Sequence, residues 1–140
     1  MTKKISQMEK LVEILKVNQG WPLIVEGLDA QDFAESPTIQ ADCDASELAL
    51  IPTEKGYIFP KWLSKLVKDS KEFKNVFLCI SGLDTVSFEL QERFYGLLKY
   101  KGLNGMKLPE NTQIVIVANH GGIENISQKI KSLTISFVLE

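Results

Sequence analysis

Val-Phe-Leu-Cys-Ile, at residues 76–80, decides the fold, because five apolar residues in a row are followed at once by Ser81 and Gly82. A strand that is apolar at every position, and not at every second one, is typical of a central strand in a parallel sheet covered on both faces. A second such run, Ile-Val-Ile-Val, occupies residues 114–117. We expect these two runs to be adjacent, parallel, central strands.

Shorter segments on either side extend this pattern. Further strands are predicted at residues 23–25, 39–43 and 135–139. Apolar residues at helical spacing predict helices over residues 5–17, from Pro60 at a first helical position, and along the stripe Leu90, Phe94, Leu97 and Leu98. Asn104-Gly105 predicts a tight turn. Alternating strands and helices predict an α/β fold, a three-layer, doubly wound parallel sheet of about five strands.

The composition of the chain narrows its functional class. Its 140 residues fit one domain, and its net charge of −2 creates no field that would draw it to nucleic acid or to a membrane. No apolar run approaches the roughly 18 residues of a membrane span. Cys43 and Cys79 lie far apart and suggest no disulfide framework, with Cys79 inside the apolar run as a buried thiol. We therefore expect a cytoplasmic protein with neither membrane nor nucleic acid as its main partner.

Polar residues follow the predicted strands at their carboxyl ends, where α/β sheets gather their functional groups. Glu26-Gly27 follows the strand at residues 23–25, Ser81, Gly82 and Asp84 follow the first quoted run, and Asn119-His120 follows the second. Ser81, Asp84 and His120 could form a hydrolase triad, although no nucleophile-elbow motif is present. In the simpler interpretation, the Asn119 amide cross-links neighbouring strand ends.

Residues 55–119 resemble the core of AAA+ ATPases, most closely the MoxR-like branch. The resemblance is carried by residues 56–63, the strand at 76–80, the helix with Gln91, the segments 103–105 and 108–112, and the strand that ends in Asn119. In that family the order is a substrate-side helix, the Walker B strand, its helix, a short hairpin and the sensor-1 strand. The resemblance implies strand order 5-1-4-3-2. It also implies that residues 1–140 form a single core domain without the C-terminal helical lid.

The first departure from the family is at the phosphate-binding loop. The family's first strand runs into GxxxxGK[ST], whose backbone N–H groups and lysine hold the phosphates. Here the strand runs into Gly27, and the interval between Lys16 and Lys55 has eight acidic residues and no lysine or arginine. One like-charge pair at 4 Å costs about 4 kcal/mol at an effective dielectric near 20. We therefore expect no bound nucleotide, metal or other cofactor.

The sequence also departs from the family at the catalytic positions. Ser81 and Gly82 stand where the Walker B strand should end in Asp-Glu, which hold magnesium and orient the attacking water. Asp84 comes two residues later. Leu133 occupies the position of the arginine finger, and Arg93, the sole arginine, matches no finger. We interpret the chain as a non-enzymatic pseudo-ATPase that serves as a protein-interaction or structural module.

Several alternatives stay open. The resemblance makes an AAA+ or von Willebrand A-type protein a possible partner and leaves the oligomeric state undecided. A small hydrolase or weak nucleotide-binding protein could use the strand-end crevice. A nucleic-acid adaptor could use the lysines at positions 61, 65, 68, 71 and 74. Phe59 and Trp62 could anchor a partner, but core packing is the simpler interpretation. Asp42, Cys43 and Asp44 read as a solvated turn more readily than as metal ligands.

Overall fold

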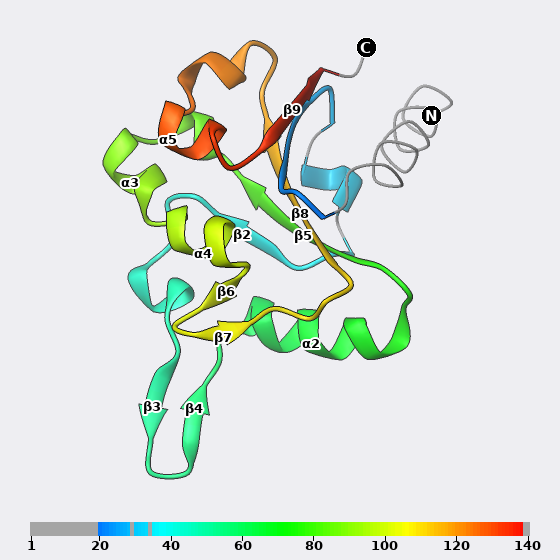
Figure 1. Cartoon of the computed structure of the whole chain (residues 1–140), viewed down its shortest axis with the longest axis vertical. Helices are drawn as coiled ribbons and strands as arrows, with labels where there is room; N and C mark the ends of the chain where they lie inside the picture. Colours follow the sequence, from blue (N-terminus) through cyan, green and yellow to red (C-terminus); the bar gives the residue numbers. More distant parts are fainter. Residues whose placement is uncertain (1–19, 29, 34, 139–140) are drawn as a thin grey trace.

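The computed structural model describes residues 20–28, 30–33 and 35–138 of the chain. Within these ranges, one all-parallel sheet has the order β2-β5-β8-β1-β9 (Figure 1). Its strands are β1 (Leu23–Glu26), β2 (Thr38–Gln40), β5 (Val76–Ser81), β8 (Thr112–Ala118) and β9 (Ile135–Val138). Counted along the sequence and read from β9, this order is 5-1-4-3-2, as the resemblance implies. The prediction of a five-stranded parallel α/β fold is confirmed.

The two quoted apolar runs lie side by side in the middle of the sheet. β5 pairs with β8 in parallel, with Val76 opposite Thr112 and Ser81 opposite Val117. All seven residues of β8 are buried, as expected for a strand covered on both faces. The prediction of adjacent, parallel central strands is therefore confirmed.

The direction of each crossover decides which face of the sheet each connection covers. The chain moves one way across the sheet from β1 to β2, and it returns the other way in all later steps. Because parallel crossovers are right-handed, the first connection covers one face and the later ones cover the opposite face. The later connections contain α2 (Lys61–Glu72), α3 (Phe88–Glu92), α4 (Tyr95–Tyr100) and α5 (Gln128–Lys131). Among its described residues, the first contains only the 3-10 helix η1 (Ala30–Phe33).

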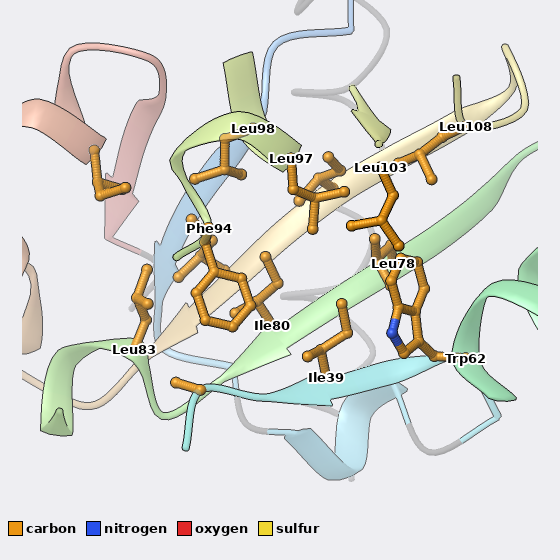
Figure 2. Packing of buried hydrophobic residues seen from close by; sticks show 14 of the residues in the cluster. Ile39, Trp62, Leu78, Ile80, Leu83, Phe94, Leu97, Leu98, Leu103 and Leu108 are labelled. Carbon is orange, nitrogen blue, oxygen red and sulfur yellow. The ribbon is translucent and has the colours of Figure 1, made fainter. Parts of the chain in front are cut away.

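Two apolar clusters fill the two sides of the sheet. The larger one joins Leu78, Ile80 and the other inward residues of that face to the helices, as Figure 2 shows with Trp62, Phe94 and Leu97. The smaller cluster lies on the opposite face and includes Cys79 together with Phe33 of η1. The alternation of Leu78, Cys79 and Ile80 between the clusters follows from the two-residue period of a strand. The helix predicted over residues 5–17 lies outside the described residues.

Several predicted bounds need correction. The second strand ends at Gln40 and not at residue 43, because the chain turns there and the Cys43 N–H donates to the Gln40 carbonyl at 3.0 Å. The apolar stripe over residues 90–98 is two short helices, separated by a turn at Arg93 and Phe94. Pro60 is the residue that caps α2 and not its first helical residue.

Two hairpins extend from the helical side of the sheet. β6 (Gly102–Leu103) and β7 (Met106–Lys107) are joined by Asn104-Gly105, both with positive φ, as the turn prediction required. β3 (Ile51–Thr53) and β4 (Gly56–Ile58) form a second hairpin that the sequence analysis did not predict. All six of its strand residues are exposed, and it projects from the body of the molecule in Figure 1.

Candidate functional site

The carboxyl ends of β1, β5 and β8 meet at one edge of the sheet, where short 3-10 helices continue the chain. β5 runs into η3 (Leu83–Thr85) through Gly82, which adopts a left-handed φ of 81°. β8 runs through residues 119–121 into η4 (Gly122–Asn125). η3 and η4 contact each other, so residues that follow two different strands lie together over the strand ends.

Asp84 is the centre of this arrangement. Its side chain is buried, and its Oδ2 accepts hydrogen bonds from the backbone N–H of Asn119 at 3.1 Å and from the Asn119 Nδ2 at 3.2 Å. Within the described residues, Oδ1 has no hydrogen-bond partner and is also buried. Asn119, which the resemblance aligns with sensor 1, therefore makes an internal contact with Asp84. The interpretation of Asn119 as a cross-link between strand ends is confirmed.

Glu26 supplies a second buried carboxylate at the same edge. It is the last residue of β1, and its Oε1 accepts a hydrogen bond from the backbone N–H of Ile123 in η4 at 3.1 Å. The sequence analysis placed Glu26 at a strand end but gave it no role of its own in the site. Its signal was available, because a carboxylate directly after a buried apolar strand must either face the crevice or find a hydrogen-bond donor.

Gly122 brings η4 into close contact with Asp84. A Cβ atom at this position would collide with the Asp84 carboxylate, so any side chain would force the two apart. The far end of η4 is also fastened, because the fully buried Gln91 donates to the Asn125 carbonyl at 2.8 Å and accepts from the Ser127 N–H at 2.8 Å. The chain's own backbone is thereby held over the strand ends from both sides.

The resemblance assigns phosphate binding to the connection between β1 and β2. Between β1 and β2 the described residues form only η1, with Gln31 and Asp32 in its middle. A phosphate site of the family type needs backbone N–H groups at the N-terminus of a following helix, and a lysine. In residues 27–37 neither feature is present among the described positions.

Ser81, Asp84 and His120 are the residues of the alternative triad. Asn119 occupies the Oδ2 atom of Asp84, and no hydrogen bond in the described part of the chain joins Ser81, Asp84 and His120. The His120 side chain is exposed on the loop that follows β8. Ser81 is half-buried, and its carbonyl accepts a hydrogen bond from the Ala41 N–H at 2.8 Å.

The other residues singled out in the sequence have structural places. Arg93 donates to the carbonyls of Cys43 and Ala41, both at 2.8 Å, and so ties α3 to the turn after β2. Leu133 is half-buried against the larger core cluster. Trp62 is a core residue, as the simpler interpretation held, and its Nε1 donates to the Glu47 carbonyl at 2.7 Å. Phe59 is half-buried against the same cluster.

The lysines of the predicted basic face lie on α2 and just beyond it. Most are exposed, and Lys65 pairs with Asp69 at 2.9 Å on the same helix. Asp42 and Asp44 are exposed in the turn after β2. In the part of the chain that the structure describes, His, Cys, Asp and Glu form no group of three or more that could hold a metal ion.

Three cavities of the molecule lie away from the strand ends. The first, of about 760 Å³, lies between α4 and the β6–β7 hairpin, and the second, of about 500 Å³, lies beside α2 and the start of β5. The third, of about 310 Å³, adjoins residues 20–22. None of the three is lined by Glu26, Asp84 or Asn119.

Comparison with known proteins adds evidence about the fold. No family model matches the chain, and no curated protein matches it. Among solved structures, it is similar to a DNA polymerase III gamma subunit-related protein from Thermotoga maritima, with a TM-score of 0.53 and 14% sequence identity. The similarity covers 96% of this chain and 46% of the other, so this chain spans less than half of that protein's length.

The described residues also contain no helix with the length and apolar character needed to cross a bilayer. Taken with the strand order, the similarity to a solved structure shows an α/β fold built on a five-stranded parallel sheet.

Proposed function

We propose that the chain is a catalytically inactive AAA+-like core that acts as a protein-interaction or structural module. The observation that carries the proposal is the position of η4. The backbone N–H of Ile123 in η4 donates a hydrogen bond to Glu26 at the end of β1. The backbone N–H of Asn119, in the loop that leads into η4, donates one to Asp84 after β5. In a P-loop fold the phosphates bind at the end of the first strand, so the contact of η4 with Glu26 at that end supports the proposal.

The charge at this edge supports the same conclusion. A triphosphate would meet two buried carboxylates, Glu26 and Asp84, with no lysine supplied by the connection between β1 and β2. Burial strengthens such repulsion because the effective dielectric constant is lower than in water. Ser81 and Gly82 offer no magnesium ligand of the Walker B type, and Leu133 offers no charge to stabilise a transition state.

A role in binding proteins is supported by what the fold exposes. On the β3–β4 hairpin, Ile51, Tyr57 and Ile58 are all exposed, and a two-stranded ribbon with apolar side chains in water is marginally stable by itself. Exposed apolar residues that serve no core are typical of contact surfaces. The name of the similar solved structure describes a subunit-related protein, which fits membership of a complex. The AAA+ or von Willebrand A-type partner implied by the resemblance to the MoxR-like branch is part of this proposal.

The experiment that tests inactivity measures phosphate release from Mg-ATP by the parent chain and by the double variant Ser81→Asp/Gly82→Glu. We expect no turnover from either, because phosphoryl transfer needs the phosphate cradle, magnesium, the water-orienting group and the finger together. The variant should also lose stability, since Gly82 has a positive φ that a glutamate adopts only with strain.

The hydrolase alternative is tested by measuring hydrolysis of a chromogenic ester by the parent and by a His120→Ala variant. Turnover of ATP by the parent or by the double variant would contradict the proposal. Ester hydrolysis that is lost on replacing His120 would replace it with the hydrolase function.

A further inference from the structure

Two of the cavities adjoin each other along α4, on the helical side of the sheet. The cavity of about 760 Å³ is lined by α4, the β6–β7 hairpin and Leu48 of η2 (Ala45–Leu48). The cavity of about 310 Å³ is lined by residues 20–22, the end of α4 and residues 132–133. Lys99 lines both, and we call the two adjoining cavities together the α4 groove. It lies away from the strand ends and is independent of the proposed loss of ATPase activity.

The α4 groove is basic along its whole length. Its lining includes Arg93, Lys99, Lys101 and Lys107, and no acidic residue, in a chain that has 18 of them. Lys101 is held in place, because its Nζ donates to the Gly20 carbonyl at 2.8 Å. Lys99 and Lys107 are exposed, and no ion pair neutralises either of them within the described residues. The net charge of −2 therefore conceals a local field that attracts anions.

Exposed aromatic rings accompany the positive charge. Tyr100 is 67% exposed and lines the larger cavity, and Trp21 is 50% exposed and lines the smaller one. The Lys99 Nζ lies 5.4 Å from the centre of the Tyr100 ring, so charge and ring act at the same place. Gly96, Gly102 and Gly105 also line the larger cavity, where the lack of side chains leaves room for a flat ligand.

We propose that the α4 groove binds single-stranded nucleic acid, with phosphates on Lys99 and Lys107 and a base stacked on Tyr100. Proteins that bind single strands without sequence preference combine a positive groove with aromatic rings on which bases stack. An acidic peptide would satisfy the lysines equally well but would gain little from an exposed ring. The ring therefore favours nucleic acid, and the test makes the peptide a separate outcome.

The test measures fluorescence anisotropy of a labelled oligothymidylate of about 12 nucleotides, within the site sizes of single-strand binders, titrated with the full chain. Tyr100→Ala should weaken binding about fivefold or more, whereas Tyr100→Phe, which keeps the ring, should bind like the parent. The matched control is Tyr57→Ala, because Tyr57 is 63% exposed on the distant β3–β4 hairpin. That variant should bind like the parent.

The contribution of the lysines is tested by the dependence of binding affinity on salt concentration. Lys99→Ala/Lys107→Ala should reduce the slope of log affinity against log salt by about 1.4, since each phosphate contact to a single strand contributes about 0.7. The control Lys61→Ala/Lys68→Ala removes the same charge from exposed positions of α2 and should leave the slope unchanged. All four side chains are exposed, so thermal melting should show every variant folded.

Three results would overturn the proposal. One is the absence of salt-dependent binding by the folded parent. The second is an equal loss in the groove variants and their controls, which would mean diffuse charge attraction. The third is displacement of the oligothymidylate by poly-glutamate at equal charge concentration, with no effect of Tyr100→Ala, which would assign the groove to acidic peptides.

Discussion

Asp84 and Gly122 are the two residues whose close packing holds η3 and η4 together beside the strand ends. Asp84 follows β5, Gly122 begins η4, and only a residue without a side chain can approach the carboxylate as closely as Gly122 does. Asn119 then holds the same carboxylate through two donors. Each of these contacts joins residues more than thirty positions apart, so substitutions at single positions can test them.

Gly122→Ala should destabilise the fold by about 1–3 kcal/mol, because the added methyl group must displace Asp84 or η4 from a packed site. Gly96→Ala is the matched control, since a Cβ at Gly96 in α4 has open space around it. That control should be neutral or should stabilise the fold by about 0.5–1 kcal/mol, because alanine favours helices over glycine. Urea denaturation measures both changes, and equal stability of the two variants would refute the contact.

Asn119→Ala should cost about 1 kcal/mol, because it removes one of the two hydrogen bonds to Asp84 and leaves the backbone one in place. The neighbouring His120→Ala should change the free energy of unfolding by less than about 0.5 kcal/mol, as is usual for exposed positions. If His120→Ala is as costly as Asn119→Ala in the same denaturation assay, the assignment of the cross-link to Asn119 is wrong.

Cys79 gives the fold a pH dependence above neutrality. Burial in the smaller cluster raises the pKa of its thiol from 9.0 to about 11. Between these values the unfolded thiol ionises while the folded one stays protonated, so stability falls as the pH rises, by at most about 1.4 kcal/mol per pH unit. The contribution is fully present below pH 9.

Denaturation of the parent and of Cys79→Ala at pH 8 and pH 10.5 measures this contribution. The parent should lose more stability than the variant over that interval, because all other groups titrate in both proteins. Parallel losses in the two proteins would show that the Cys79 thiol ionises as readily in the folded chain as in the unfolded one.

At the scale of elements, helices and strands that bury apolar residues in the core could be predicted from the sequence. Elements that bury none could not. Trp62, Leu63 and Leu66 recur at helical spacing and place α2 correctly, because all three are buried. β3 and β4 bury nothing, so no apolar alternation marks them, and only the turn at residues 54–55 before Gly56 hinted at a hairpin. The second strand was predicted too long because its last residues turn away from the sheet.

The same contrast predicts the cost of two aromatic substitutions. Trp62→Ala should destabilise the fold by about 3–5 kcal/mol, because it leaves a cavity in the larger cluster and the Glu47 carbonyl without its donor. Tyr57→Ala on the β3–β4 hairpin should cost less than about 0.5 kcal/mol, because its ring is exposed. Thermal and urea denaturation measure both, and a large loss for Tyr57→Ala would mean that the hairpin packs on the body.

At the scale of the whole molecule, the sequence predicted the sheet but not the contacts between the strand ends and η4. Strand order followed from the resemblance, and the absence of a lysine after Gly27 or a carboxylate at Ser81 can be read directly. The contacts of Glu26 with Ile123 and of Asp84 with Asn119 could not be read in this way, because they depend on where η4 folds back over the sheet. Buried carboxylates at strand ends were the available signal, and their partners required the structure.

The central claim is that the strand ends no longer accept a nucleotide, and titration of the full chain with Mg-ATP tests it most directly. Calorimetry up to millimolar ligand should give no saturable heat, and the melting temperature should stay unchanged. A ligand present at one hundred times its dissociation constant would stabilise the fold by about 2.7 kcal/mol, which melting detects easily. A saturable heat with a matching rise in melting temperature, abolished by Gly27→Val at the end of β1, would show that the crevice is open and would contradict the account.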